Sequence, residues 1–259
     1  MLIATFRAAA LAPALVTVAC ASTPGARPHD MSVARHEAEA ARHAGEARSH
    51  ESRYRPSARA AYQASCLAGV GAGRIGVAYS DTCWSSFVNP TEGHLRQAAE
   101  HRRHAADHRA ASVALREAEA RACAGLPPDD RDLTPFLHAE DIESVTPLRV
   151  EETGAGEEIP RERLAGATVV FRAVEGLNAE WFQRLVDCHL ARNAALGHEV
   201  PEMPDCPLVP KGARAQVRPV GNGFAVEITA GDRATANEIL ARARRLGPGS
   251  VEPTAKRVQ

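Results

Sequence analysis

Aromatic residues and lysine are scarce in this sequence of 259 residues. Lysine occurs only at positions 211 and 256, so almost every basic side chain is an arginine. Phe, Trp and Tyr together make up 4% of the chain, too few for a surface on which nucleic-acid bases stack. Basic and acidic residues nearly balance, with 31 Lys and Arg against 32 Asp and Glu. Because nucleic-acid binding depends on a local excess of positive charge, we expect no nucleic-acid partner.

Motifs that carry common catalytic chemistry are also missing. The sequence has no G-x-S-x-G elbow, no phosphate-binding loop and no H-E-x-x-H zinc motif. The stretch from Gly71 to Gly76 matches the letters of the dinucleotide fingerprint. No strand pattern precedes it and no helix pattern follows it, so we attribute the match to chance. We therefore expect no enzymatic activity and no nucleotide cofactor.

Long hydrophobic runs are absent after the first twenty residues, so no later segment approaches the length of a transmembrane helix. At the start of the chain, Arg7 precedes an apolar stretch from Ala8 to Ala19. This charge and this length are typical of a signal peptide. The sequence therefore predicts an export segment over residues 1–21.

The end of this segment resembles the lipobox of bacterial lipoproteins, in the stretch Leu15-Val16-Thr17-Val18-Ala19-Cys20. The resemblance implies that Cys20 carries a lipid and that the protein is anchored on the periplasmic side of the cell envelope. Because Ala21 rather than an aspartate follows the cysteine, it also implies sorting to the outer membrane. Simple secretion stays open, since Ala19-Cys20-Ala21 also has the pattern of an ordinary cleavage site.

Export would place the six cysteines in an oxidising compartment, so we interpret them first as disulfides. Two pairs are close in sequence, Cys66 with Cys83 and Cys188 with Cys206. A bridge that closes a loop of this size contributes about 3 kcal/mol in the chain-entropy model. Cys123 is then left over. We interpret it as a buried thiol in an alanine-rich helix, with a mixed disulfide or a metal ligand as alternatives.

Two long helices joined by a disulfide-closed loop are predicted for residues 22–126. From Asp30 to about Tyr62 the sequence is rich in Ala, Glu, Arg and His and has almost no helix breaker. Residues 63–90 are rich in glycine, which is typical of a loop. A second helical pattern follows and stops at Gly125, with two prolines just beyond it. This arrangement predicts an antiparallel helical hairpin.

The rest of the chain is predicted to be a linker over residues 127–165 and a small domain over residues 166–259. The linker is rich in acidic residues, proline and glycine. The predicted elements of the domain are a strand over 167–174, a helix capped by Asn178, strands over 216–220 and 224–229, and a helix capped by Asp232. The sequence therefore predicts an α+β protein, with a long helical hairpin followed by a β-α-β-β-α domain.

Histidines recur every seven residues in both predicted helices. Each set forms a nearly straight stripe, because seven residues are about two helical turns. Successive histidines of one stripe are about 10.5 Å apart, too far to share an ion with bonds of about 2.0–2.1 Å. In an antiparallel hairpin, however, a single register pairs three rungs at once. The predicted rungs are His36 with His108, His43 with His101, and His50 with His94.

These rungs predict a metal site between the helices. His104 adds three- and four-residue spacings to His101 and His108, which allow one helix to chelate an ion. The predicted ligands are His36, His43, His50, His94, His101, His104 and His108. Acidic residues nearby could orient these ligands or complete the coordination, namely Glu46, Glu100 and Asp107. Imidazole suits zinc, copper and nickel.

Other interpretations of the histidines stay open. Stripes of this kind can be solvated faces, or they can pack as half-apolar spacers between alanine-rich helices with no ion. They can also sense pH, because imidazole titrates near neutrality. A separate group of soft metal ligands would suit copper(I) if its cysteines were reduced. Its members are close in sequence: Cys188, His189, His198, Met203 and Cys206. In an oxidising compartment we favour a disulfide between Cys188 and Cys206 instead. Such a disulfide would remove the thiolates that attract copper(I).

The sequence taken as a whole favours a cell-envelope lipoprotein that captures or buffers a divalent transition metal, zinc or copper, without catalysis. The membrane would be a partner through the N-terminal lipid, and an envelope protein or a second copy of the chain could be another. The alternative is a structural or interaction module of the envelope, whose alanine-rich arms pack against such a partner.

Overall fold

The computed structural model of the protein describes residues 23–58, 62–67, 82–87, 89–152 and 161–248, with the strands at 62–67 and 82–87 described by their backbone alone. Cys20 lies outside the described residues, as does the stretch from Gly71 to Gly76. The described residues form long helices and an antiparallel four-stranded sheet, so the predicted α+β class is confirmed. None of the described helices is both long enough and apolar enough to cross a membrane.

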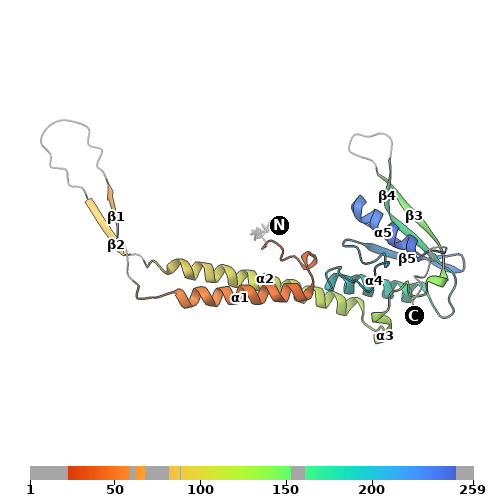
Figure 1. The fold of residues 1–259 in the computed structure, drawn as a ribbon, viewed down its shortest axis with the longest axis horizontal. Helices are drawn as coiled ribbons and strands as arrows, with labels where there is room; N and C mark the ends of the chain where they lie inside the picture. Colours follow the sequence, from red (N-terminus) through yellow and green to blue (C-terminus); the bar gives the residue numbers. More distant parts are fainter. Residues whose placement is uncertain (1–22, 59–61, 68–81, 88, 153–160, 249–259) are drawn as a thin grey trace, which may run out of the picture.

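A long helical hairpin extends away from the C-terminal domain (Figure 1). Helix α1 (Val33–Arg53) and helix α2 (Glu92–Ala122) run antiparallel and pack against each other. The predicted hairpin is therefore confirmed. Helix α1 ends earlier than the sequence pattern predicts, because Pro56 lies just beyond it and a proline disfavours helical geometry in the residue that precedes it.

A two-stranded ribbon lies at the far end of the hairpin (Figure 1). It consists of β1 (Tyr62–Leu67) and β2 (Thr82–Phe87), which pair in antiparallel fashion. Cys66 and Cys83 are directly opposite each other in this ladder. Their side chains lie outside the described residues, so the bridge between them stays a prediction that this register favours.

The C-terminal domain contains one more strand than the sequence pattern indicated. Its order is β3 (Ile142–Glu152), β4 (Arg161–Phe171), α4 (Ala179–Ala195), β5 (Arg214–Val220), β6 (Gly223–Thr229) and α5 (Arg233–Leu246). The strands form one antiparallel sheet in the spatial order β3-β4-β6-β5. The predicted β-α-β-β-α order was therefore incomplete.

The additional strand falls in the region predicted as a linker. Residues 127–165 contain β3, the start of β4 and two short helices, α3 (Pro128–Asp132) and η2 (Ala139–Asp141). Strand β3 lies at a sheet edge, where proline such as Pro147 is tolerated because one side of the strand needs no ladder partner. The acidic residues of β3 and this proline are typical of a linker, so composition alone did not indicate a strand here.

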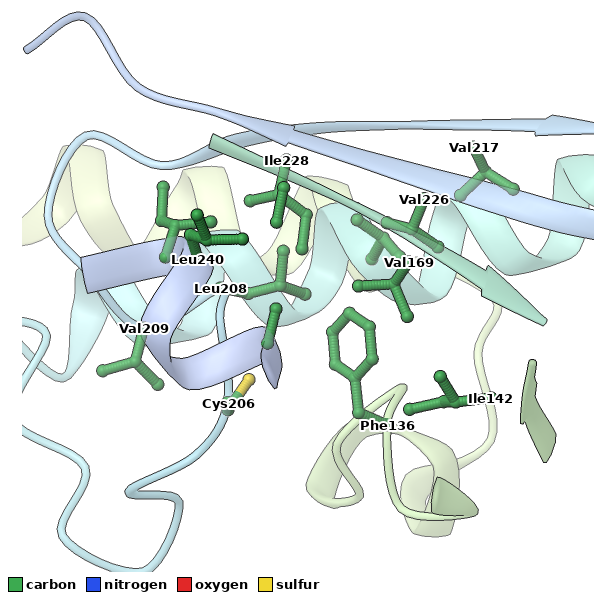
Figure 2. Close-up of a cluster of buried hydrophobic side chains, with 14 of the residues drawn as sticks. Phe136, Ile142, Val169, Cys206, Leu208, Val209, Val217, Val226, Ile228 and Leu240 are labelled. Carbon is green, nitrogen blue, oxygen red and sulfur yellow. The ribbon is translucent and has the colours of Figure 1, made fainter. Parts of the chain in front are cut away.

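One hydrophobic core holds the domain together (Figure 2). Val169 of β4 and Val226 of β6 are fully buried neighbours at its centre. Ile239 of α5 belongs to the same cluster. Phe136 and Ile142, from the region predicted as a linker, are 2% and 3% exposed in this core. The segment after the hairpin is thus part of the domain.

The hairpin joins the domain where the end of α2 meets α4. A disulfide links Cys123, which follows α2, to Cys188 of α4, across Cα atoms 4.6 Å apart. The predicted bridge between Cys188 and Cys206 is wrong, and so is the prediction of a free thiol at Cys123. Cys206 is buried and free. Its Sγ lies 3.4 Å from Nε2 of His189.

The correction has a simple geometric reason. Side chains of consecutive helical residues point about 100° apart. Helix α4 packs against the end of α2 on one side and against the loop that carries Cys206 on another. Cys188 points toward the end of α2, while His189 points toward the loop that carries Cys206. Closeness in sequence suggested the wrong partner because it ignored which face of the helix each side chain occupies.

We expect the free energy of unfolding to be about 4 kcal/mol lower in the Cys123→Ser/Cys188→Ser double variant than in the parent protein, according to the chain-entropy model. The reason is that the native bridge spans a sequence separation of 65. Urea denaturation under non-reducing conditions measures this loss. Cys206→Ser is the matched control, since it alters a buried thiol but removes no bridge. A peptide map that joins Cys188 to Cys206 would contradict the assignment.

Candidate metal centre

The two histidine stripes lie along the contact between α1 and α2. Ser32 caps α1 by accepting a hydrogen bond from the backbone N–H of Arg35 at 3.2 Å. The helices approach closely because small side chains line the contact. The buried alanines of this contact are Ala40, Ala47, Ala98 and Ala105. With so little bulk between them, the helices bring the longer imidazoles face to face.

The predicted register is confirmed in all three rungs. The Nδ1 atoms of His36 and His108 are 3.1 Å apart. Those of His43 and His101 are 3.0 Å apart. Those of His50 and His94 are 3.1 Å apart. In each rung the same ring nitrogen of both histidines points into the gap between the helices, so each rung offers two nitrogen ligands to one position.

The rungs also contact one another. The ring centroid of His43 is 5.8 Å from that of His108 in the rung before it, and the two rings are stacked. His50 stacks on His101 in the same way, with centroids 5.5 Å apart. The rings thus form one zigzag column across the helices. The spacing of about 10.5 Å along a single stripe therefore does not isolate the rungs from each other.

The middle rung is the densest group of potential ligands. Oε2 of Glu46 lies 3.2 Å from Nδ1 of His43 and 2.9 Å from Nδ1 of His101. Together with the 3.0 Å between the nitrogens, these distances define a nearly regular triangle. Two ligands of a tetrahedral ion with bonds of about 2.0–2.1 Å lie about 3.3 Å apart. The three atoms therefore form a triangle close in size to one face of such a coordination shell.

Two further observations indicate that this rung could hold a cation. Among the residues that the structure describes, Oε2 of Glu46 is buried and has no hydrogen bond of acceptable geometry, although a buried carboxylate oxygen normally has a partner. His104 also lies beside the rung, with its ring centroid 5.0 Å from that of His43. One ligand atom each of His43, His101 and His104 fall within 4.8 Å of one another.

A second group overlaps the first. Ligand atoms of Glu39, His43 and His108 also lie within 4.8 Å of one another. This group lies between the middle rung and the rung of His36 and His108. His43 belongs to both groups, so it is central to any ion bound in this part of the hairpin.

Arg42 holds the two carboxylates in place. Its guanidinium donates to Oε2 of Glu39 at 2.6 Å and to Oε1 of Glu46 at 2.7 Å. The hydrogen bond from Arg42 is the largest effect on Glu39 and lowers its pKa. For Glu46, desolvation raises the pKa, but the hydrogen bond and charge of Arg42 outweigh it, so the net pKa is lowered. Both carboxylates are therefore ionised at neutral pH.

Three of the hairpin histidines, His43, His50 and His108, have lowered pKa values that favour their neutral form. Desolvation lowers the pKa of His43, and the charge of Arg42 lowers it further. Desolvation likewise lowers the pKa of His108, with a contribution from His36, and that of His50, with a contribution from His94. Metal binding requires unprotonated imidazole and ionised carboxylate. At neutral pH the hairpin presents both.

The structure brings together all seven histidines that the sequence pattern singled out. Of the three acidic residues considered, Glu46 lies at the site, Glu100 is exposed, and Asp107 accepts a hydrogen bond from Thr23. Glu39 was missed, although its spacing of four residues from His43 on the same helix could have indicated it.

The group of soft metal ligands in the C-terminal domain does not assemble. Cys188 is in a disulfide, and Nδ1 of His198 donates to the carbonyl of Val209 at 2.9 Å. The buried pair of Cys206 and His189 remains. Desolvation raises the pKa of the Cys206 thiol and lowers the pKa of His189 to about 4. This pair is therefore uncharged at neutral pH.

No protein-family model, curated protein or solved structure matches this chain. The class that the fold and the site define is an α+β protein with a histidine-lined helical hairpin, in which groups of three histidine or carboxylate ligands could hold a metal ion. The donor set of imidazole and carboxylate suits borderline divalent ions.

We expect the hairpin to lose stability as the pH falls below the usual histidine value of about 6.5. The pKa values of His43, His50 and His108 are lowered in the folded protein, so the unfolded chain takes up protons first. The stability is complete above that pH and decreases below it. Melting temperatures between about pH 7.5 and about pH 5, above the carboxyl range, measure the effect.

The control for this prediction is His43→Gln, which removes one of the three hairpin rings whose pKa is lowered. His189 and His198, outside the hairpin, also have lowered pKa values, that of His189 about 4, but they contribute equally to both proteins. The melting temperature of the variant should therefore depend less on pH. Identical pH profiles for the two proteins would contradict the assignment of this effect to the hairpin.

Proposed function

We propose that this protein is a lipoprotein of the cell envelope that captures or buffers a divalent transition metal through the histidines of its hairpin. The observation that carries the proposal is the convergence of three ligand atoms at the middle rung, from His43, His101 and Glu46, at mutual distances of 2.9 to 3.2 Å. Such a cluster of lone pairs is unfavourable unless a proton or a cation lies among them.

The ligand set points to zinc or copper(II). Imidazole suits both ions, and a carboxylate adds a harder oxygen ligand, which disfavours copper(I). Capture or storage fits the site better than catalysis because the hairpin repeats a facing pair of Nδ1 atoms in three rungs. A catalytic centre would instead need one open position beside a substrate pocket.

The proposed location depends on the N-terminal segment. The lipobox-like stretch that ends at Cys20 supports export and lipid anchoring, with the outer membrane as the destination that Ala21 favours. The disulfide between Cys123 and Cys188 supports the same proposal, because stable disulfides are typical of proteins outside the cytosol.

A structural or interaction module is the second candidate. The observation that favours it is that Nδ1 atoms 3.0 to 3.1 Å apart are also at hydrogen-bond distance. Each rung could then be closed by one shared proton, and the hairpin would hold itself together without an ion. Exposed apolar side chains on α2, Leu95 and Val113, would be available to a partner.

Zinc and copper titration of the purified protein distinguishes the two functions. If the hairpin binds an ion, a ligand concentration of a hundred times the dissociation constant should stabilise the fold by about 2.7 kcal/mol. His101→Gln and Glu46→Gln should each weaken binding about tenfold or more, since each removes a direct ligand. Isothermal titration calorimetry and melting temperatures measure both effects.

The matched control is His138→Gln, because His138 is an exposed histidine outside the hairpin. This variant should bind metal as the parent does. A melting temperature unchanged by a tenfold excess of either metal would reject the proposed function in favour of the interaction module.

A further inference from the structure

The segment that precedes α1 is docked on the hairpin. Thr23 is 8% exposed, and its Oγ1 donates to Oδ2 of Asp107 on α2 at 2.5 Å. A turn follows, closed by a hydrogen bond from the N–H of Ala26 to the carbonyl of Thr23 at 3.1 Å. The short helix η1 (Pro28–Asp30) then packs against α2. Because Ser32 caps α1 by itself, the helix does not need this segment as its cap.

This segment reaches the first rung through a backbone carbonyl. Nε2 of His36 lies 3.2 Å from the carbonyl oxygen of Pro28. A carbonyl can only accept a hydrogen bond, so Nε2 of His36 carries the proton. In the neutral ring Nδ1 is then unprotonated, and it is this atom that points at Nδ1 of His108, 3.1 Å away. His36 is therefore fixed in the tautomer that can bind an ion in the gap between the helices.

The first rung differs in this respect from the middle one. Nε2 of His43 lies 3.1 Å from the guanidinium of Arg42, which can only donate, so the neutral ring carries its proton on Nδ1. An ion bound by Nδ1 of His43 would therefore have to displace this proton, whereas Nδ1 of His36 is already unprotonated. Metal-binding histidines usually donate their second ring N–H to a carbonyl or a carboxylate, which orients the ring and raises its basicity. Among the rungs of the described hairpin, His36 has this partner, and the partner comes from the N-terminal segment.

We propose that the segment from Thr23 to Asp30 is a positioning element of the first rung, and that its docking is coupled to metal binding by His36 and His108. The inference rests on the proposed function. Docking presents Nδ1 of His36 to the ion, so it raises the affinity of the rung. By thermodynamic reciprocity, a bound ion must strengthen the docking by the same factor. The part of the chain that follows the proposed lipid anchor would thereby respond to metal.

The test compares Thr23→Val, which keeps the shape of the side chain but removes the donor to Asp107, with Thr23→Ser, which retains a hydroxyl. Each protein is titrated with zinc while the side-chain 15N resonances of its histidines are recorded. His36 reports on the first rung and His101 on the middle one. Thr23→Val should weaken zinc binding at His36 by about threefold or more and leave the zinc affinity at His101 unchanged. Thr23→Ser should keep the parent's affinity at both.

A second measurement tests the reciprocal effect, which a purely structural role of Thr23 would not produce. The amide of Asp30 donates to the carbonyl of Arg27 within the docked segment. Zinc should slow hydrogen exchange of this amide in the parent protein, and less so in Thr23→Val. Unchanged zinc affinity at His36 in Thr23→Val, or unchanged exchange at Asp30, would overturn the coupling.

The outcomes separate the two proposals. If His101 responds to zinc while His36 behaves alike in the parent and in Thr23→Val, the coupling is wrong and metal capture stands. If neither His36 nor His101 responds to zinc, the proposed function fails and the coupling fails with it.

Discussion

The close antiparallel contact between α1 and α2 is the constraint on which the site depends. Alanines such as Ala98, which is fully buried, line this contact and let the helix backbones approach. At that separation, imidazoles on facing positions are brought to contact distance, with paired nitrogens 3.0 to 3.1 Å apart. Larger apolar residues at the alanine positions would push the helices apart and replace three rungs by an ordinary hydrophobic seam.

This constraint leaves the hairpin with few other sources of stability. Alanine buries little apolar area, so the hydrophobic contribution per residue is small. The ion pairs across the helices, Glu51 with Arg102 and Glu37 with Arg116, are largely exposed and therefore contribute little. What remains is the packing of the rings, the disulfide that ties the end of α2 to α4, and the docked segment before α1. The geometry of the potential metal ligands and the stability of the hairpin thus both depend on the histidine rings.

The parts of the fold that could be predicted from the sequence are those with a strong period. Equal steps of seven residues in both helices mean that one correct rung makes all three correct. Choosing the register that pairs the most histidines is then enough to pair His43 with His101. The disulfide could not be predicted in this way, because its partners are far apart in sequence and depend on which face of α4 each side chain occupies. Strand β3 was missed for another reason: an edge strand with a proline has the composition of a linker.

The rungs are equally spaced, but their surroundings make them chemically different. His36 and His108 are almost fully buried, and a backbone carbonyl sets the tautomer of His36. The middle rung adds Glu46, whose negative charge would offset that of a cation. The rung of His50 and His94, nearest the ribbon, is more exposed. Equal spacing comes from the sequence alone, whereas the differences come from α1 neighbours four residues or fewer away and from a segment that only the tertiary fold brings to the hairpin. If such a ladder binds ions, it should bind them unequally along its length, because charge and desolvation change from rung to rung while the ring geometry does not.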